Sequence, residues 1–223
     1  MIQPNKILVI APHPDDETLG AGGTIVKLSK LGAKVSILFV SGHMPPLYTE
    51  KEYKLIKNES HKALKILGVK NCQFLDIPAT KVHEIPISEL NKKIKDYLDQ
   101  IKPDTVLIPF ADRHIDHRTI FDSSMVACRP TGKHFPSTVL AYETLSETHW
   151  NAPYVEANFV PDLFFNIDNA IDTKISALRK YKSQINNKAP SRSLDAVKAL
   201  ARFRGSQNGC KYAEGFKVLR IIL

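Results

Sequence analysis

The sequence predicts an α/β fold, with one Rossmann-like, doubly wound, mostly parallel sheet and helices on both faces. Short continuous apolar runs, such as residues 7–11 and 105–110, are typical of strands that are buried on both faces of a parallel sheet. Segments with apolar residues at three- and four-residue spacing, such as 88–101, alternate with these runs and are typical of amphipathic helices. Strands that alternate with helices imply parallel strands joined by right-handed crossovers.

The expected elements follow from the same two patterns. The expected strands cover residues 7–11, 34–40, 72–75, 105–110, 139–143, 163–167 and 218–223, and the expected helices cover residues 24–31, 53–67, 88–101, 118–127, 172–185 and 193–203. Gly32 and Gly68 are natural ends for the first two helices, and Ser88 is a natural cap for the third. If the strand order is 3-2-1-4-5, it reverses between the first and fourth strands, and ligands bind beyond the carboxyl ends of strands at such a reversal.

Length and composition favour a single domain over residues 1–223. The chain has 223 residues, of which 43% are apolar, and this suits one well-buried α/β unit. The first expected strand begins too early for a signal peptide, and no apolar run reaches transmembrane length. We therefore expect a cytoplasmic protein without membrane insertion. Cys72, Cys128 and Cys210 are an odd number without close pairs, so we expect reduced thiols rather than disulfides.

The net charge of +8 is concentrated near the end of the chain. From residue 170 onward there are 12 Lys/Arg and 3 Asp/Glu, so this part carries +9 and the preceding part about −1. These basic residues lie on two expected amphipathic helices, and no nucleic-acid-binding module accompanies them. We do not expect a nucleic-acid partner, whereas a substrate that carries phosphate or a nucleotide stays open.

Two clusters of polar residues follow the first and fourth expected strands. The first cluster directly follows the strand at residues 7–11 and contains His13, Asp15, Asp16 and Glu17. Its carboxylates would repel one another unless a cation lies among them. Acidic residues can also cap a helix or interact with its dipole, which would explain this cluster without a metal. The second cluster, DRHIDH at residues 112–117, favours the metal, because two such clusters are expected at the same edge of the sheet.

The ligand chemistry of these clusters indicates a catalytic metal site. His13 and Asp16 are close enough to converge on one ion, and either His114 or His117 could supply the third ligand. Two imidazoles and one carboxylate with open positions suit Zn²⁺ and also resemble the facial triad of Fe²⁺. Such an ion polarises a carbonyl and makes water nucleophilic near neutral pH. Asp15 points elsewhere if Asp16 faces the ion, which makes Asp15 the candidate base. The glycines at 20, 22 and 23 do not match a dinucleotide fingerprint, and no G-x-S-x-G or P-loop motif is present.

The two motifs together carry a family resemblance. PHPDDE at residues 12–17 and HIDH at residues 114–117 resemble the PIG-L/LmbE-like metal-dependent N-deacetylases, which remove acetyl groups from N-acetylglucosaminyl and related amino-sugar conjugates. LGAGGTI, DRHIDHR, KYKSQ and YAEGF extend the resemblance over most of the chain. By position, the resemblance implies His13, Asp16 and His117 as zinc ligands, Asp15 as general base, His114 facing the oxyanion or leaving amine, and Asp116 orienting His114. Ile115 stands where proline is common in the family, and this change removes no ligand.

The expected substrate is a small N-acetylated amino sugar in a glycoconjugate, nucleotide sugar or thiol glycoside. Two alternatives stay open, namely a catalytically inert sugar- or metal-binding protein of the same fold and a ferrous-iron enzyme. The candidate substrate-binding residues are His43, Asp112, Arg113 and Arg204, although a plain helix end at Gly205 is the favoured interpretation of the last. Loops 42–52, with Tyr48, and 149–161, with Trp150, are expected to shape the pocket. A homo-oligomer is compatible with these patterns.

Overall fold

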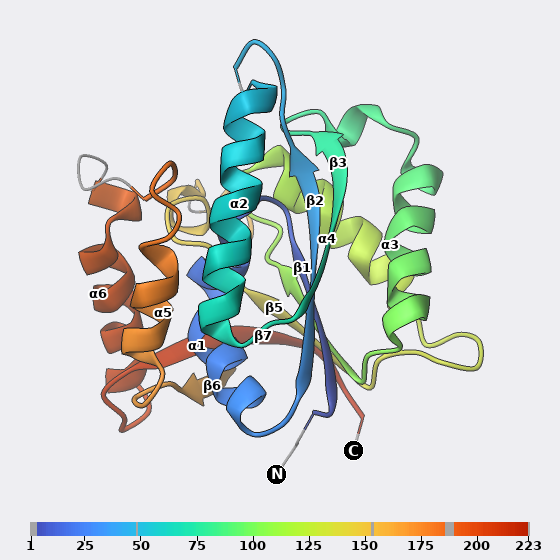
Figure 1. The fold of residues 1–223 in the computed structure, drawn as a ribbon. Helices are drawn as coiled ribbons and strands as arrows, with labels where there is room; N and C mark the ends of the chain where they lie inside the picture. Colours follow the sequence, from blue (N-terminus) through green and yellow to red (C-terminus); the bar gives the residue numbers. More distant parts are fainter. Residues whose placement is uncertain (1–3, 48, 153, 186–189, 223) are drawn as a thin grey trace.

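The structure is a computed structural model that describes residues 4–47, 49–152, 154–185 and 190–222 (Figure 1). Tyr48 lies outside the described residues. The strands are β1 Lys6–Ala11, β2 Lys34–Gly42, β3 Asn71–Pro78, β4 Thr105–Pro109, β5 Thr138–Tyr142, β6 Leu163–Asn166 and β7 Ala213–Ile221. The helices are α1 Asp16–Lys30, α2 Glu50–Leu67, α3 Ile87–Ile101, α4 Ile115–Ala127, α5 Ile171–Leu178 and α6 Leu194–Ser206.

All seven strands form one sheet in the order β3-β2-β1-β4-β5-β7-β6. Strands β1 to β5 pair in parallel, and β7 is antiparallel to both of its neighbours. The predicted α/β fold with a mostly parallel sheet is confirmed, and the first five strands have the expected order. The order reverses between β1 and β4, so the carboxyl ends of these two strands meet at one edge of the sheet.

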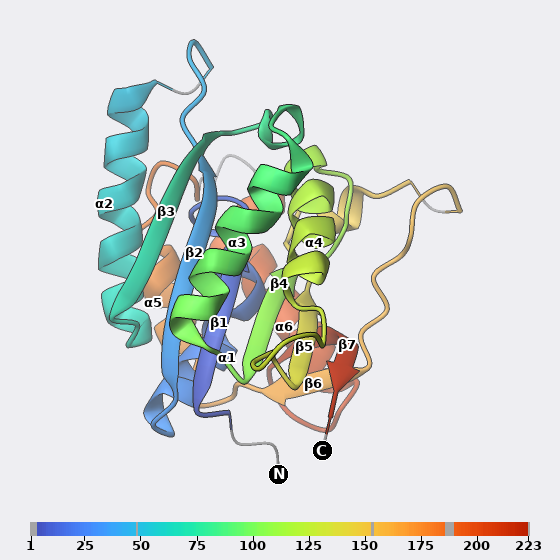
Figure 2. The ribbon, with the colours of Figure 1, turned by 90° about the vertical axis from the view of Figure 1, so that its right-hand side faces the viewer.

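The core lies on both faces of the sheet because alternate residues of a strand point to opposite sides. In β1, Ile7, Val9 and Ala11 pack against α1, α2, α5 and α6, whereas Leu8 and Ile10 pack against α3 and α4. Figures 1 and 2 show these two layers of helices on either side of the sheet. Burial on both faces explains why β1, β4 and β5 are almost continuously apolar.

The last strand connects the sheet to the helix that follows β1. Both oxygens of the buried Glu214 on β7 accept hydrogen bonds from α1, at 2.8 Å from Gly23 N and 2.7 Å from Thr24 N. Lys174 of α5 donates to the same carboxylate at 2.6 Å and to the Leu19 carbonyl at 2.7 Å. The charge of Glu214 is therefore neutralised where it is buried, and α1, α5 and β7 are held together.

Several element ends differ from the sequence-based predictions. Helix α1 begins at Asp16 rather than at residue 24, and α4 begins at Ile115 rather than at residue 118. In both cases the polar cluster forms the first helical turn, which apolar spacing does not reveal. Helix α3 begins after Pro86 instead of being capped by Ser88, and α5 ends at Leu178, seven residues before the predicted end. Strand β7 begins at Ala213 instead of residue 218.

A search of the described residues for membrane-crossing helices found none with the necessary length and apolar character.

Candidate active site

The turn after β1 places Asp15 and Asp16 at the start of α1. Asp15 is the N-cap residue and has φ of 127°, a conformation that L-residues rarely adopt. Its backbone N–H donates to Glu17 Oε2 at 3.1 Å, and Tyr181 donates to the other oxygen of Glu17 at 2.7 Å. The buried Glu17 carboxylate thus holds the backbone of Asp15 in its strained conformation.

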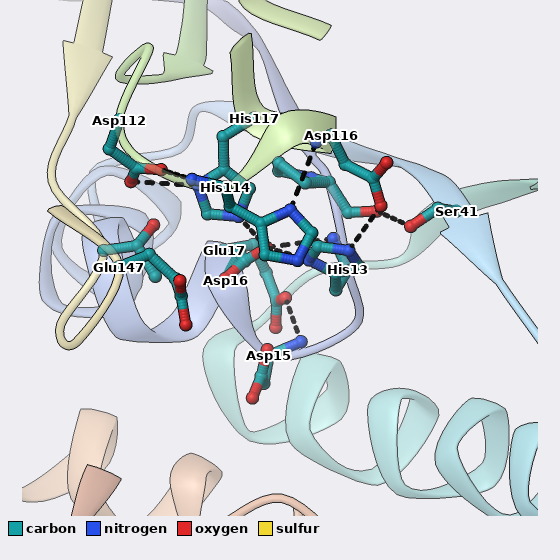
Figure 3. A network of polar contacts seen from close by, with 12 residues as sticks. His13, Asp15, Asp16, Glu17, Ser41, Asp112, His114, Asp116, His117 and Glu147 are labelled. Carbon is teal, nitrogen blue, oxygen red and sulfur yellow. Dashed lines mark hydrogen bonds and ion pairs between the residues drawn. The ribbon is translucent and has the colours of Figure 1, made fainter. Parts of the chain in front are cut away.

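The loop after β4 brings the second cluster to the same place, as Figure 3 shows. His114 is the N-cap residue of α4, while Asp116 and His117 lie in the first turn of that helix. Asp116 and His117 are fully buried, and His114 is partly exposed. The side chains of both clusters therefore meet where β1 and β4 end, as the sequence predicts.

Three side chains converge on a position that suits a metal ion. Asp16 Oδ2 lies 3.2 Å from His13 Nδ1 and 3.3 Å from His117 Nε2, and the three candidate ligand atoms are all within 4.8 Å of one another. Asp16 Oδ1 and His117 Nε2 are buried and have no hydrogen-bond partner among the described residues. Buried polar atoms normally have partners, so these unpaired atoms and their chemistry fit a bound divalent cation.

Each histidine of this group is also held by a carboxylate through its other ring nitrogen. His117 Nδ1 lies 3.0 Å from Asp112 Oδ2, and His13 Nε2 lies 3.0 Å from Asp116 Oδ2. Metal-binding histidines typically donate their second N–H to a carboxylate in this way, which fixes the tautomer and the ring orientation. His13, His114 and Asp116 form a second group with metal-binding distances. The His13, Asp16 and His117 group fits better because both of its histidines have carboxylate partners.

These contacts correct the predicted role of Asp112 and specify that of Asp116. Asp112, expected to bind substrate, is buried and instead accepts hydrogen bonds from His117, from Thr148 at 2.8 Å and from the His114 backbone at 3.0 Å. Asp116 was expected to orient His114, and it does so through its backbone rather than its carboxylate, which contacts His13 and the Thr80 N–H. The backbone N–H of Asp116 orients His114, because it donates to Nδ1 at 3.1 Å.

This backbone contact also determines the proton position on His114. Because Nδ1 accepts a hydrogen bond, the neutral ring carries its proton on Nε2. Burial lowers the pKa of His114 to about 4, and the positive charges of His13 and His117 contribute to the same shift. His114 is therefore a neutral hydrogen-bond donor near pH 7.

The buried carboxylates shift the pKa values of the two candidate ligand histidines in the opposite direction. Burial alone would lower the pKa of His13, but its hydrogen bonds with Asp116 and Asp16 raise it to about 9. Burial acts likewise on His117, but the charge of Asp16 and the Asp112 contact raise its pKa to about 10. The group thus strongly favours positive charge, which a divalent cation supplies.

The predicted base, Asp15, lies beside this group without touching it. Burial raises the pKa of Asp15 to about 7, although the positive charge of Arg192 acts in the other direction. Arg192 Nη1 lies 3.6 Å from Asp15 Oδ2, which has no hydrogen-bond partner among the described residues. Asp15 Oδ2 thus accepts no hydrogen bond from the described residues and has Arg192 as its ion-pair partner.

A cavity of about 370 Å³ opens next to these residues. His13, Asp15 and His114 line it together with residues from the end of β2, from α2, from the turn after β3, from the segment after β5 and from residues 191–192. The pocket therefore contains one candidate ligand, the candidate base and the neutral donor. A substrate in this cavity would reach all three side chains.

The remaining predicted substrate-binding residues lie elsewhere. Arg204 is buried and binds Glu143 through two contacts of 2.8 and 2.7 Å, so its guanidinium is occupied outside the cavity. Arg204 and Gly205 also lie within α6, which continues to Ser206, so Gly205 does not end that helix. His43 stacks on Tyr53 with ring centroids 5.6 Å apart and does not line the cavity, and Arg113 is exposed outside it.

The structure adds residues that the sequence reasoning did not identify. Glu147 and Arg192 line the cavity, Thr148 supports Asp112, and Tyr181 supports Glu17. They come from three separate segments without a spacing that relates them to either motif. KYKSQ, which contains Tyr181, was part of the resemblance and is the one sequence signal that pointed toward any of them.

Comparisons with known proteins place the chain in a family. Residues 8–128 match the family model described as PIG-L, GlcNAc-PI de-N-acetylase. The uncharacterized deacetylase YaiS of Escherichia coli K12 is 30% identical over 185 residues, which cover 79% of this chain and 90% of YaiS. The diacetylchitobiose deacetylase of Thermococcus kodakarensis is 28% identical over an alignment of 229 residues, covering 95% of this chain and 82% of that protein.

A solved structure agrees with these sequence matches. The N,N'-diacetylchitobiose deacetylase from Pyrococcus horikoshii superposes with a TM-score of 0.78 at 25% identity, covering 97% of this chain and 84% of that one. The sequence match spans both polar clusters of the candidate active site. This chain therefore belongs to the PIG-L family of de-N-acetylases.

Proposed function

We propose that this protein is a zinc-dependent hydrolase that removes the N-acetyl group from an N-acetylated amino sugar. The arrangement of His13, Asp16 and His117 carries the proposal, because their ligand atoms converge and both histidines are held by carboxylates. Membership of the PIG-L family and the amino-sugar deacetylases among its relatives support the reaction and the substrate class.

Each residue has a role that follows from its position. A divalent cation held by His13, Asp16 and His117 would polarise the amide carbonyl and lower the pKa of water. Asp15, which lines the cavity and whose Oδ2 accepts no hydrogen bond from the described residues, takes the proton from the attacking water. His114 donates its Nε2–H to the oxygen on which negative charge develops. Since His114 is neutral, protonated Asp15 rather than His114 returns the proton to the departing amine.

The proposal is tested by acetate release. The purified chain is stripped with a chelator, reloaded with Zn²⁺ or, without oxygen, with Fe²⁺, and incubated with N-acetylglucosamine glycosides and N,N'-diacetylchitobiose. We expect about one ion per chain and acetate release only from the reloaded protein. A fully loaded protein that releases no acetate from any of these amides would contradict the proposal and favour an inert binding protein. If only the Fe²⁺-loaded protein released acetate, the catalytic metal would be iron rather than zinc.

The expected cytoplasmic location and the absence of a nucleic-acid partner stay predictions, and the oligomeric state stays open.

A further inference from the structure

The cavity has sides of different chemistry beyond the candidate catalytic residues. Tyr53 and Ile56 of α2 and Ala79 after β3 supply apolar and aromatic surface. Glu147, from the segment after β5, and Arg192 supply charged groups. Such a combination suits a sugar ring, which has apolar C–H faces and a polar edge of hydroxyls.

The carboxylates that line the cavity neutralise the positive charge of Arg192. Arg192 is the one Lys or Arg side chain among the described lining residues. Its Nη2 donates to Glu147 Oε1 at 3.2 Å, its Nε donates to Ser146 Oγ at 3.1 Å, and its Nη1 faces Asp15 at 3.6 Å. Two carboxylates and a hydroxyl therefore surround the guanidinium, which leaves no unpaired positive charge there for an anion.

The candidate metal site does not reverse this balance. Two charges of a divalent cation would face three buried carboxylates, those of Asp16, Asp112 and Asp116. Glu147 balances the single positive charge of Arg192, and Asp15 adds a further negative charge whenever it is ionised. The charges of the described residues around the cavity are therefore negative overall, and they favour a neutral sugar and a cationic amine product over an anionic substituent.

The position of the amide determines which substituent enters this negative region. In a 2-acetamido sugar, the carbon that carries the nitrogen is bonded directly to C1 and C3. When the acetamido group lies at His13 and His114, the C1 substituent is thus next to the reacting amide. A phosphate at C1 would lie close to the carboxylates of the cavity.

Resting on the proposed deacetylase function, we propose that the cavity accepts amino sugars with an uncharged C1 substituent and rejects sugar 1-phosphates and nucleotide sugars. Glu147 is the specificity-determining residue. Its Oε1 contacts Arg192 and Ser146, so Oε2 can accept a hydrogen bond from a sugar hydroxyl. The same carboxylate neutralises Arg192, which would otherwise be an anion-binding group.

The test is a binding measurement that needs no turnover. The zinc-loaded full-length chain is titrated calorimetrically with methyl α-glucosaminide, with α-glucosamine 1-phosphate and with inorganic phosphate alone. We expect the 1-phosphate to bind about tenfold or more weakly than the methyl glycoside and no more tightly than inorganic phosphate.

Variants identify the residue responsible for the preference. Glu147→Gln should weaken binding of the methyl glycoside severalfold and strengthen binding of the 1-phosphate, because Arg192 loses the closer of its two carboxylate partners. Glu156→Gln is the matched control, since Glu156 pairs with Arg118 at 3.5 Å and does not line the cavity. This control should leave both affinities unchanged.

The inference is overturned if the methyl glycoside does not bind, or if the 1-phosphate binds more tightly than both the glycoside and inorganic phosphate. An unchanged affinity ratio in Glu147→Gln also overturns it. Separate acetate assays distinguish this failure from failure of the proposed function. Equal kcat/KM values for the N-acetylated glycoside and the N-acetylated 1-phosphate would overturn the proposed selectivity and support the proposed deacetylase function. If the protein shows the binding preference but releases no acetate, the proposed selectivity is supported and the proposed deacetylase function is contradicted.

Discussion

Replacing Asp112 by Asn should weaken metal binding although Asp112 is not a ligand. The two oxygens of Asp112 accept three hydrogen bonds, from His117 Nδ1, Thr148 Oγ1 and the His114 N–H. An asparagine has one NH₂ group, which would face either His117 or the His114 N–H. In the first case His117 must move its proton to Nε2 and can no longer bind metal through that atom. In the second case the partly buried His114 N–H loses its acceptor, which costs up to about 1–3 kcal/mol.

Loss of such a carboxylate partner typically lowers metal affinity about 10- to 100-fold, which corresponds to about 1.4–2.7 kcal/mol. The affinity is measured by competition with a chromogenic chelator of known zinc affinity. Thr148→Val is the matched control, because it removes one donor to Asp112 and leaves the carboxylate on His117. We expect its effect to be much smaller. A zinc affinity of Asp112→Asn within twofold of the unmodified protein would refute the supporting role of Asp112.

Three other substitutions test separate parts of the structure. Asp15→Asn should keep its metal, measured by elemental analysis, while the rate of acetate release falls about 10²- to 10⁴-fold; loss of the metal would show that Asp15 is a ligand. His114→Ala should lower kcat about 10²- to 10³-fold with metal content and KM nearly unchanged, and a rise confined to KM would argue against oxyanion stabilisation. Gly20→Ala should lower Tm by several degrees, because the new Cβ would overlap the Tyr142 ring and lie 2.8 Å from the Glu143 carbonyl oxygen. Because this overlap is with a ring carbon of Tyr142, the overpacking cost should be near the upper end of about 1–3 kcal/mol and exceed the helix-propensity gain of about 1 kcal/mol. An unchanged or higher Tm in thermal unfolding would contradict this packing.

The sequence predicted the position of the site because its information there is local. His13 and Asp16 share one turn, His114 and His117 share another, and the alternation of strands and helices brings both turns to the same sheet edge. The starts of α1 and α4 were placed too late because their first turns consist of polar site residues. Apolar periodicity, the signal used to place helices, is absent from such turns.

Contacts between side chains distant in sequence were less predictable. The spacing of DRHIDH is compatible with Asp112 facing either the substrate or His117, and only the three-dimensional arrangement distinguishes these roles. Arg192 is remote from both motifs and meets Asp15 and Glu147 through tertiary packing. Arg204, which has a similar sequence context in a basic segment, instead binds Glu143 within the protein. Charge alone does not distinguish these two arginines.

The position of β7 has a consequence for the order in which the chain can assemble. Strand β7 lies between β5 and β6, so β6 has no strand neighbour until the segment 213–221 has been synthesised and inserted. The same segment supplies Glu214, whose contact with Gly23 spans 191 residues of sequence. Closing so long a loop is slow compared with forming the local β1–α1–β2 contacts. Helix α1, which carries Asp16, can therefore form early on the ribosome, but its hydrogen bonds to Glu214 can form only near the end of translation.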